Sequence, residues 1–199
     1  MPSKRTTTQA QRFQALHELA VAAGGVADPR ALAKLTVDHA RVLLAVDSAG
    51  LYWLDASGLM AVLADNDPEA TARDLPPREG IVGQIMQHGA PVVVEDYQGW
   101  QHRVPWVAAR GVQSSAGVPI LVGERSLGAL VVRSKKPHAF DVREIQTLAV
   151  LVAQVGPVIE VARLYAESER RRTEAEALAT LAREGANSRD TEQAARLIT

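Results

Sequence analysis

Apolar residues recur along this chain with two different periods, which separate expected helices from expected strands. Spacings of three and four residues predict helices over 9–23, 28–46 and 81–88 and from Asp141 onward. Short apolar runs bounded by turn residues predict strands over 49–54, 59–64 and 91–95. Helix ends are marked by Gly24-Gly25 and Gly89, and a helix start by Asp28-Pro29. We expect 65–78 to be a loop.

A hairpin between Ser114 and Ser134 is the clearest single element. Two β-rich runs flank Gly123-Glu124, and Gly123 can take the positive φ that a tight turn needs. The second run is apolar on both faces, with Leu127, Ala129 and Val131 on one and Leu130 and Val132 on the other. A central strand covered on both sides has this pattern. The chain is therefore expected to be α+β, with a central antiparallel sheet of five to six strands and helices on both faces.

Two helices are expected to supply most of the core packing. The second helix should bury Leu32, Leu35, Val42 and Leu43. The last helix should begin at an Asp141 cap and bury Ile145, Leu148, Ala149, Val152, Val155 and Ile159. Gly156-Pro157 should interrupt and bend that helix, because proline removes a backbone hydrogen bond.

Past Pro157 the last helix becomes strongly charged but keeps a heptad-like seam. The seam is formed by Val161, Leu164, Ser168, Arg171, Ala175, Leu178 and Ala182. A helix that is polar nearly all round is not stable alone in water. We therefore expect a parallel homodimer through the C-terminal helix, with the N-terminal helix beside it. A single solvated helix is the alternative.

Composition narrows the class of protein. The chain has 199 residues, 47% of them hydrophobic, a net charge of −1 and no cysteine. These values predict a real core, no direct nucleic-acid partner, and neither disulfides nor thiol nucleophiles. The longest apolar run, Leu148–Ala153, is too short to span a bilayer, so we expect no membrane partner and a soluble, cytoplasmic protein.

Several motifs of this chain together resemble a GAF domain. Gly117–Ile120, a short turn and Leu127–Val132 are similar to the last GAF hairpin. Further similar segments lie at 75–83, 89–96 and 160–165, so the resemblance covers roughly 11–165. It implies a GAF/PAS-like fold and a small-molecule sensor of a cytoplasmic signalling protein, in a two-component or transcription-regulating context.

The resemblance also suggests an organisation for the whole chain. We expect a flexible tail at 1–10, a GAF domain at 11–160, a coiled-coil-like linker helix at 161–186 and the truncated start of a second GAF domain at 187–199. The last assignment rests on the similarity of Ala177–Ala182 to Ala15–Ala20. Chance matching between two Ala/Leu-rich helices is the alternative. The output domain, a histidine kinase, cyclase or DNA-binding domain, would belong to the full-length protein.

The segment Asp96–Trp106 holds the most distinctive candidate chemistry. In GAF domains the matching segment covers the ligand cavity, so the resemblance implies a lid. Candidate ligand-binding residues in and beside it are Asp96, Trp100, His102, Trp106, Arg110, Ser114 and Ser115. The tryptophans would stack on a flat ligand, and His102, Arg103 or Arg110 would meet an anionic group. The alternative is that the tryptophans cap the core and the polar groups face water.

No catalytic or metal-binding pattern stands out, so we expect a protein that is not an enzyme. The five histidines lack metal-type spacing. The cofactor is unknown: bilin-binding and methionine-sulfoxide-reducing GAF proteins use cysteines, which this chain lacks. Cyclic-nucleotide GAF domains carry Asn-Lys…Phe…Asp-Glu, which Ser134-Lys135 and Phe140 match only in part. Haem binding would need His102, which lies too early in the loop. A ligand-free GAF fold serving as a dimerisation or spacer module is the alternative to a sensor.

Overall fold

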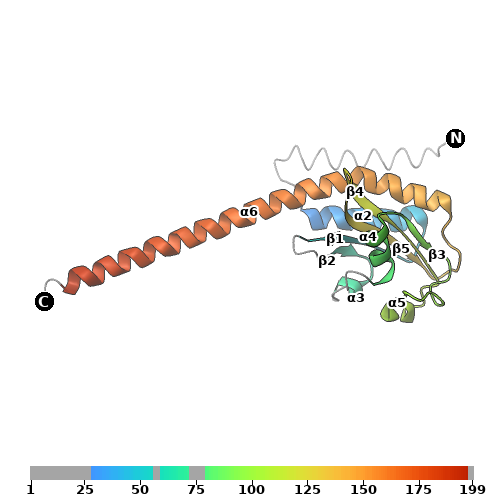
Figure 1. Cartoon of the computed structure of the whole chain (residues 1–199), viewed down its shortest axis with the longest axis horizontal. Coiled ribbons are helices and arrows are strands. Elements are labelled where there is room, and N and C mark those ends of the chain that lie inside the picture. The colour runs from blue at the N-terminus through green and yellow to red at the C-terminus, as the bar shows by residue number, and fades with distance from the viewer. Residues whose placement is uncertain (1–27, 56–58, 72–78, 197–199) are drawn as a thin grey trace.

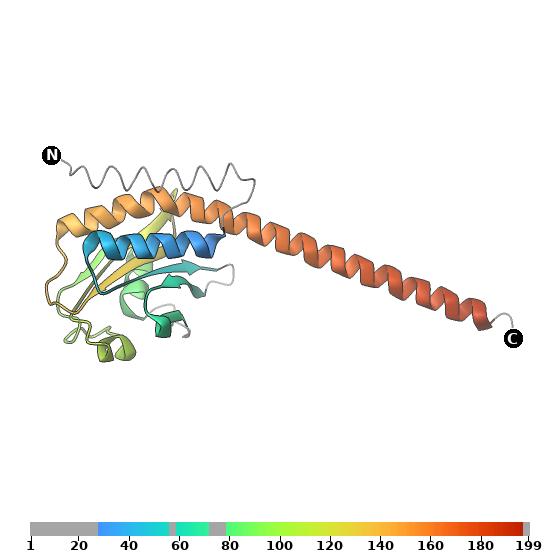
Figure 2. The ribbon, with the colours of Figure 1, turned by 180° about the vertical axis from the view of Figure 1, so that it is seen from behind.

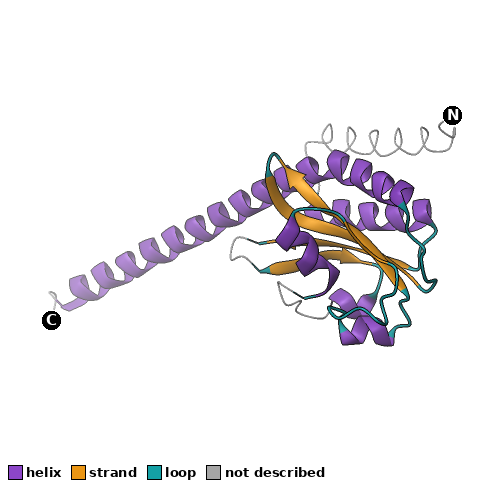
Figure 3. Ribbon diagram, turned by 45° about the vertical axis from the view of Figure 1, so that its right-hand side comes forward, coloured by secondary structure: helices purple, strands orange, loops and turns teal. Residues whose placement is uncertain are grey.

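The centre of the molecule is a five-stranded antiparallel sheet. The computed structural model describes residues 28–55, 59–71 and 79–196 (Figure 1). The strands are β1 (Ser48–Leu54), β2 (Met60–Asp65), β3 (Val92–Val94), β4 (Ser114–Val122) and β5 (Arg125–Ser134). They lie in the order β2-β1-β5-β4-β3. The helices are α2 (Pro29–Leu44), α3 (Pro68–Thr71), α4 (Gly80–His88), α5 (Pro105–Ala109) and α6 (Val142–Arg196). Helices lie on both sides of the sheet (Figure 3), which confirms the expected fold class.

The β4–β5 hairpin turns at Gly123-Glu124 as expected. Val122 pairs with Arg125, and Gly123 has a φ of 61°. One detail of the sequence interpretation is wrong: Leu127 packs with the α2/α6 side of the sheet, not with Ala129 and Val131. The pairing jumps from Ile120↔Gly128 to Leu121↔Ser126, so Leu127 is an extra residue in a β-bulge. A bulge adds one residue to a strand, so the side chains beyond it lie on the opposite face from the one that strict alternation would give.

Helices α2 and α6 lie side by side over one face of the sheet (Figure 2). Asp28 caps α2 by accepting a hydrogen bond from the Arg30 backbone N–H, as predicted. The buried side of α2 is formed by Leu32, Ala33, Thr36, Val37 and Ala40. The expectation that Leu35 and Val42 are buried is wrong, since they are 45% and 65% exposed. The small side chains of Ala33 and Ala40 face the sheet and let α2 lie close to it. Leu35 and Val42 therefore lie on the outward side of the helix.

Helix α6 begins with a reciprocal cap and then crosses the sheet. Asp141 accepts from the backbone of Arg143 and Glu144, and the Glu144 carboxylate accepts from Asp141 N. The buried stripe is Leu148, Leu151, Val152, Val155, Ile159 and Ala162. Ala149 is exposed, contrary to expectation, because the stripe follows Leu148 and Leu151 instead.

Proline does not end α6. The helix contains Pro157 and continues to Arg196, so the expected interruption is wrong. Pro157 and Ala153, whose carbonyl loses its partner, both lie on the exposed side, where water can satisfy that carbonyl. Beyond the sheet α6 projects as a rod (Figure 1). By length and composition 142–180 is apolar enough to cross a membrane, yet its buried side chains pack on the sheet as those of a core helix do.

Some expectations fall outside what the structure describes or tests. The tail 1–10, the helix 9–23 and its Gly24-Gly25 stop lie outside the described residues. Helix α6 occupies most of 187–199, where a second domain was expected to start, and that expectation stays a prediction. The segment 65–78, expected to be a loop, contains the short helix α3. Asp67 supports α3 by accepting a hydrogen bond from Glu69 N.

Candidate ligand-binding site

The sheet face opposite α2 and α6 is covered by α4 and by the segment 96–113, which we call the lid. Buried apolar side chains from all three meet there: Tyr52, Ile81, Val82, Ile85, Tyr97, Val107, Val112, Ala129 and Val131. Trp100, Val104, Trp106 and Ala108 are partly buried and pack against this cluster. The lid therefore contributes to the core of the domain, as well as to its surface.

Backbone and side-chain hydrogen bonds connect residues within the lid. Its base is closed by Tyr97 N, which donates to Gln113 O over 2.7 Å. The Gln98 amide donates to the carbonyls of Ala108 and Val112, at 3.0 and 2.7 Å. The Tyr97 hydroxyl accepts from Val104 N. These bonds hold an irregular segment in one conformation, so it can present side chains in fixed positions.

The structure brings some of the candidate residues together within the lid. Trp100 lies against Tyr97, with 5.7 Å between ring centroids, and edge-on to His102 at 5.5 Å. His102 itself is exposed at the loop tip. Asp96 uses its Oδ1 to accept from the backbone N–H groups of Gln98 and Gly99, so it forms a turn.

The remaining candidates already have partners within the chain. The buried Ser115 lies on the lid face and donates to Val132 O over 2.9 Å. Ser114 lies on the other face and donates to Lys136 O over 2.6 Å. Arg110, just after α5, forms ion pairs with Asp67 at 3.1 Å and with Glu69 at 2.7 Å. The predicted binding residues thus do not all converge on one point.

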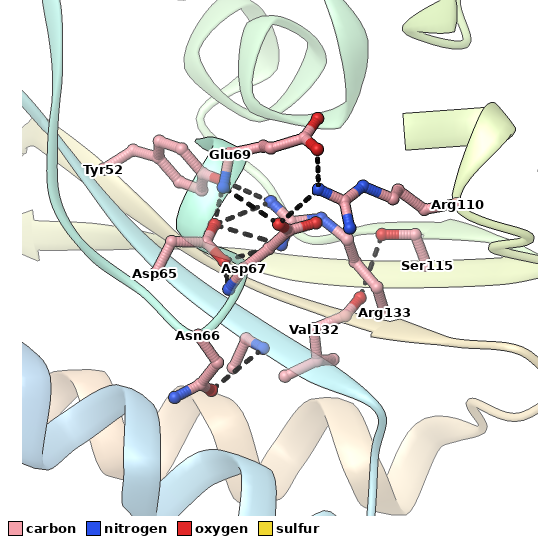
Figure 4. A network of polar contacts seen from close by, with 10 residues as sticks. Tyr52, Asp65, Asn66, Asp67, Glu69, Arg110, Ser115, Val132 and Arg133 are labelled. Carbon is pink, nitrogen blue, oxygen red and sulfur yellow. Dashed lines mark hydrogen bonds and ion pairs between the residues drawn. The ribbon is translucent and has the colours of Figure 1, made fainter. Parts of the chain in front are cut away.

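A buried polar network that the sequence analysis did not single out lies on the same sheet face (Figure 4). Arg133 on β5 contacts both carboxylate oxygens of Asp65, with nitrogen–oxygen distances of 3.1–3.3 Å. The Tyr52 hydroxyl donates to Asp65 Oδ2 over 2.6 Å and accepts from Arg133. The side chains of Arg133 and Asp65 are 8% and 0% exposed. The network is therefore a closed, charge-balanced unit inside the domain.

Local strand geometry explains how three strands bring these groups together. Regular alternation from Met60 and Val62 would put Asp65 on the α2/α6 face. The pairing jumps from Tyr52↔Val62 to Leu51↔Ala64, so Leu63 is an extra residue and Asp65 is turned to the lid face. Gly50 lies directly opposite Asp65. An added Cβ there would lie 2.1 Å from Asp65 Oδ2, so only glycine leaves room for the network.

Burial and charge fix the protonation of the network. Burial raises the pKa of Tyr52 well above its ordinary value, and the Asp65 carboxylate adds to this shift while Arg133 opposes it. Burial alone would lower the pKa of Arg133, but Tyr52 and Asp65 together raise it above its ordinary value. Tyr52 is therefore neutral and Arg133 charged at neutral pH. Burial also raises the pKa of Tyr97 in the lid.

The network continues from the sheet to the lid. Asp65 Oδ1 accepts a hydrogen bond from Asp67 N over 2.8 Å, and Asp67 Oδ1 forms the ion pair with Arg110. A chain of polar contacts thus links β5, the end of β2 and the lid (Figure 4). Among the described residues, no group of three or more histidines and acids is placed to hold a metal ion. The sequence signals for this network were an arginine directly after the largely apolar run Leu127–Val132 and a glycine in the buried strand β1.

Comparisons with known proteins agree with this architecture. A family model described as a GAF domain matches residues 26–160. No curated protein matches the chain. The GAF domain of an Acinetobacter phosphoenolpyruvate-protein phosphotransferase has a TM-score of 0.67 at 22% identity, covering 83% of this chain and 99% of that one.

Two further solved structures show how widely the fold is used. The free methionine-R-sulfoxide reductase of Neisseria meningitidis, in complex with its substrate, has a TM-score of 0.62 at 22% identity, over 73% of this chain and 86% of its own. A domain assigned to a two-component sensor histidine kinase of Sinorhizobium meliloti 1021 has a TM-score of 0.52 at 20% identity, over 69% and 92%. At these identities the similarity establishes the fold alone.

Proposed function

This chain belongs to the GAF domain family, and from that premise we propose that it is a non-enzymatic, cytoplasmic sensor domain of a signalling protein. In this proposal the lid face binds a small molecule, and α6 passes the bound state through a dimeric stalk to an output domain. Ligand binding would shift the population between two arrangements of the stalk.

The continuity of α6 is the observation that carries the proposal. One helix packs on the sheet through Leu148, Val155 and Ile159 and then runs on to Arg196. A displacement of the sheet can therefore move the rod without crossing a flexible joint. The seam side chains Val161, Leu164 and Leu178 are 65%, 55% and 68% exposed, which supports pairing with a second copy.

A second candidate function has support from the site itself. Ser114, Ser115 and Arg110 are already bonded within the chain, and Trp100 and Trp106 pack against the core. These contacts favour a ligand-free GAF fold that acts as a dimerisation and spacer module. Because reductases share the fold, fold alone does not separate sensor from enzyme. The absence of cysteine supports the non-enzymatic proposal.

Native mass spectrometry of the chain purified from cells tests both functions at once. The sensor proposal expects a dimer mass plus a retained small molecule that is lost in Trp106→Ala. Leu164→Glu should give monomers, because it places a charge in the seam, whereas Arg172→Glu, outside the seam, should leave the dimer. A ligand-free dimer would favour the spacer, and a ligand-free monomer at every concentration would contradict both.

A further inference from the structure

A concave site lies on the α2/α6 side of the sheet, where the domain meets the rod. It is a groove of about 590 Å³ between the start of α2, the β1–β2 hairpin and α6. This volume is in the range of small-molecule sites, roughly 300–1,000 Å³. Apolar lining comes from Trp53, Leu63 and Ala166, and three guanidinium groups line it as well: Arg30, Arg163 and Arg170. Aromatic, aliphatic and cationic groups therefore share one recess.

The arginines that line the groove have N–H groups without a close hydrogen-bond acceptor in the described part of the chain. Arg163 lies over the Trp53 ring, 5.7 Å from its centroid, and its buried Nε makes no hydrogen bond in the described structure. The nearest carboxylate oxygen, Oε2 of Glu160, is 3.6 Å away and is itself buried without a hydrogen bond. The Arg30 side chain forms no ion pair within the described residues, and Arg170 has only a loose, exposed partner at 3.5 Å.

The acids of the groove, in contrast, are engaged elsewhere. Glu167 pairs with Arg171, one helical turn along the rod. Asp55 accepts a hydrogen bond from Leu59 N at the hairpin turn. Arg30 thus has no ion-pair partner among the described residues, while Arg163 and Arg170 have only loose ones, at 3.6 and 3.5 Å. This favours an acidic guest, because arginine binds carboxylate and phosphate through paired hydrogen bonds.

We propose that this groove binds an amphipathic organic anion. Its apolar body packs against Leu63 and Ala166, beside the edge of the buried Trp53, and its carboxylate or phosphate group lies among Arg30, Arg163 and Arg170. Trp53 faces the α2/α6 side of the sheet, so this site is separate from the lid face and does not depend on the proposed function.

The position of the groove gives such a ligand a mechanical effect. One wall belongs to the domain, through α2 and the hairpin, and the other to α6 between Arg163 and Arg170. A bound anion would therefore contact both walls and hold the first turns of α6 beyond the sheet against the domain. The groove is a place at which a metabolite can alter the direction or stiffness of the rod directly.

Isothermal titration calorimetry of the full chain with three matched probes tests the proposal. The probes are 1-naphthyl phosphate, 1-naphthoate and the neutral 1-naphthol. We expect the acidic probes to bind at least about tenfold more tightly than 1-naphthol, since a charge-assisted hydrogen bond is lost with the neutral probe. The ratio between the two acidic probes shows whether phosphate or carboxylate is the preferred group. Arg163→Gln should weaken both by about tenfold, and the exposed Arg170→Gln provides a second variant that does not disturb the core.

Controls separate this groove from general binding of aromatic anions. Arg125→Gln, an exposed arginine on the β4–β5 hairpin, and Trp106→Ala, in the lid, should leave both affinities unchanged. NMR chemical shifts should move at Leu63 and Ala166 but not at Val131. Equal affinity for 1-naphthol, equal losses in Arg125→Gln and Arg163→Gln, or shifts confined to the lid face would each overturn the proposal.

Discussion

The Tyr52 hydroxyl donates a hydrogen bond of 2.6 Å to Oδ2 of Asp65, inside the sheet face that the lid covers. Arg133 binds the same carboxylate, so the negative charge is neutralised where water is excluded. Such a pair is costly to bury and more costly to break, because removing one member leaves the other charged and unpaired. The network therefore makes the fold depend on three strands meeting in one register.

Replacing the arginine tests that dependence. Arg133→Met should lower the free energy of unfolding in urea by about 3–5 kcal/mol, because Asp65 is left buried without a partner. Arg125→Met, at an exposed position, should change it by less than about 0.5 kcal/mol. In Asp65→Asn the further Arg133→Met substitution should cost less than in the wild type, and equal costs in both backgrounds would refute the coupling.

Alkaline pH should weaken the fold through the same network. The pKa of Tyr52 is raised in the folded state, so folding favours the protonated phenol. Its stabilising contribution is present below the unfolded-state pKa of about 10 and is lost as the pH rises through the folded-state value. The urea midpoint should therefore fall above about pH 10, and less steeply in Tyr52→Phe. Absorbance at 295 nm should show this tyrosine ionising only on unfolding. Ionisation well before unfolding would contradict the burial argument.

The contacts of Arg110 should hold the lid closed. Arg110→Gln removes ion pairs to Asp67 and Glu69, whose side chains are 15% and 56% exposed. Partly exposed pairs contribute about 0.2–1 kcal/mol each, so losing both should quicken amide exchange in 105–112 about two- to thirtyfold. Salt at 0.5 M should quicken exchange in the wild type but not in the variant.

A matched control for this experiment lies in the same loop. Arg103 is exposed, and its side chain makes one long contact, 3.5 Å to Trp100 O. Arg103→Gln should leave lid exchange unchanged. Equal exchange in all three proteins would show that apolar packing alone closes the lid.

The sequence predicted most of the fold because the decisive signals were local. Gly123 marked the hairpin turn, Asp28-Pro29 and Asp141 marked two helix starts, and short apolar runs marked the strands. The errors at Leu35, Val42 and Ala149 arose where the true buried side is set by small residues and by neighbours distant in sequence. Leu127 was misplaced because a bulge depends on the pairing of two strands.

The candidate site was less predictable than the fold. Trp100 and Trp106 were found because aromatic residues in a loop are conspicuous. The network of Tyr52, Asp65 and Arg133 was missed because its members are 13 and 68 residues apart in sequence. No local sequence pattern indicates the bulge at Leu63, which turns Asp65 to the lid face. Contacts of this kind appear only once the strand register is known.

Gly50 offers a direct test of how tightly the network is fitted. In an open site, replacing glycine by alanine stabilises a protein by about 0.4–1 kcal/mol, because the unfolded chain loses freedom. Here the added Cβ would lie 2.1 Å from Asp65 Oδ2 and 2.8 Å from the Tyr52 hydroxyl oxygen. Gly50→Ala should therefore lower the free energy of unfolding by about 1–3 kcal/mol.

A second background shows whether the carboxylate is the cause of that loss. In Asp65→Ala the obstructing oxygen is gone, so adding Gly50→Ala should cost little, since only the Tyr52 contact remains. The difference between the two backgrounds, measured by urea unfolding, is the coupling between the glycine and the carboxylate. Stabilisation by Gly50→Ala in the wild type would mean that the strands or the Asp65 side chain shift easily to make room for the added methyl group. The buried network would then be an adaptable feature that does not fix the register of β1 against β2.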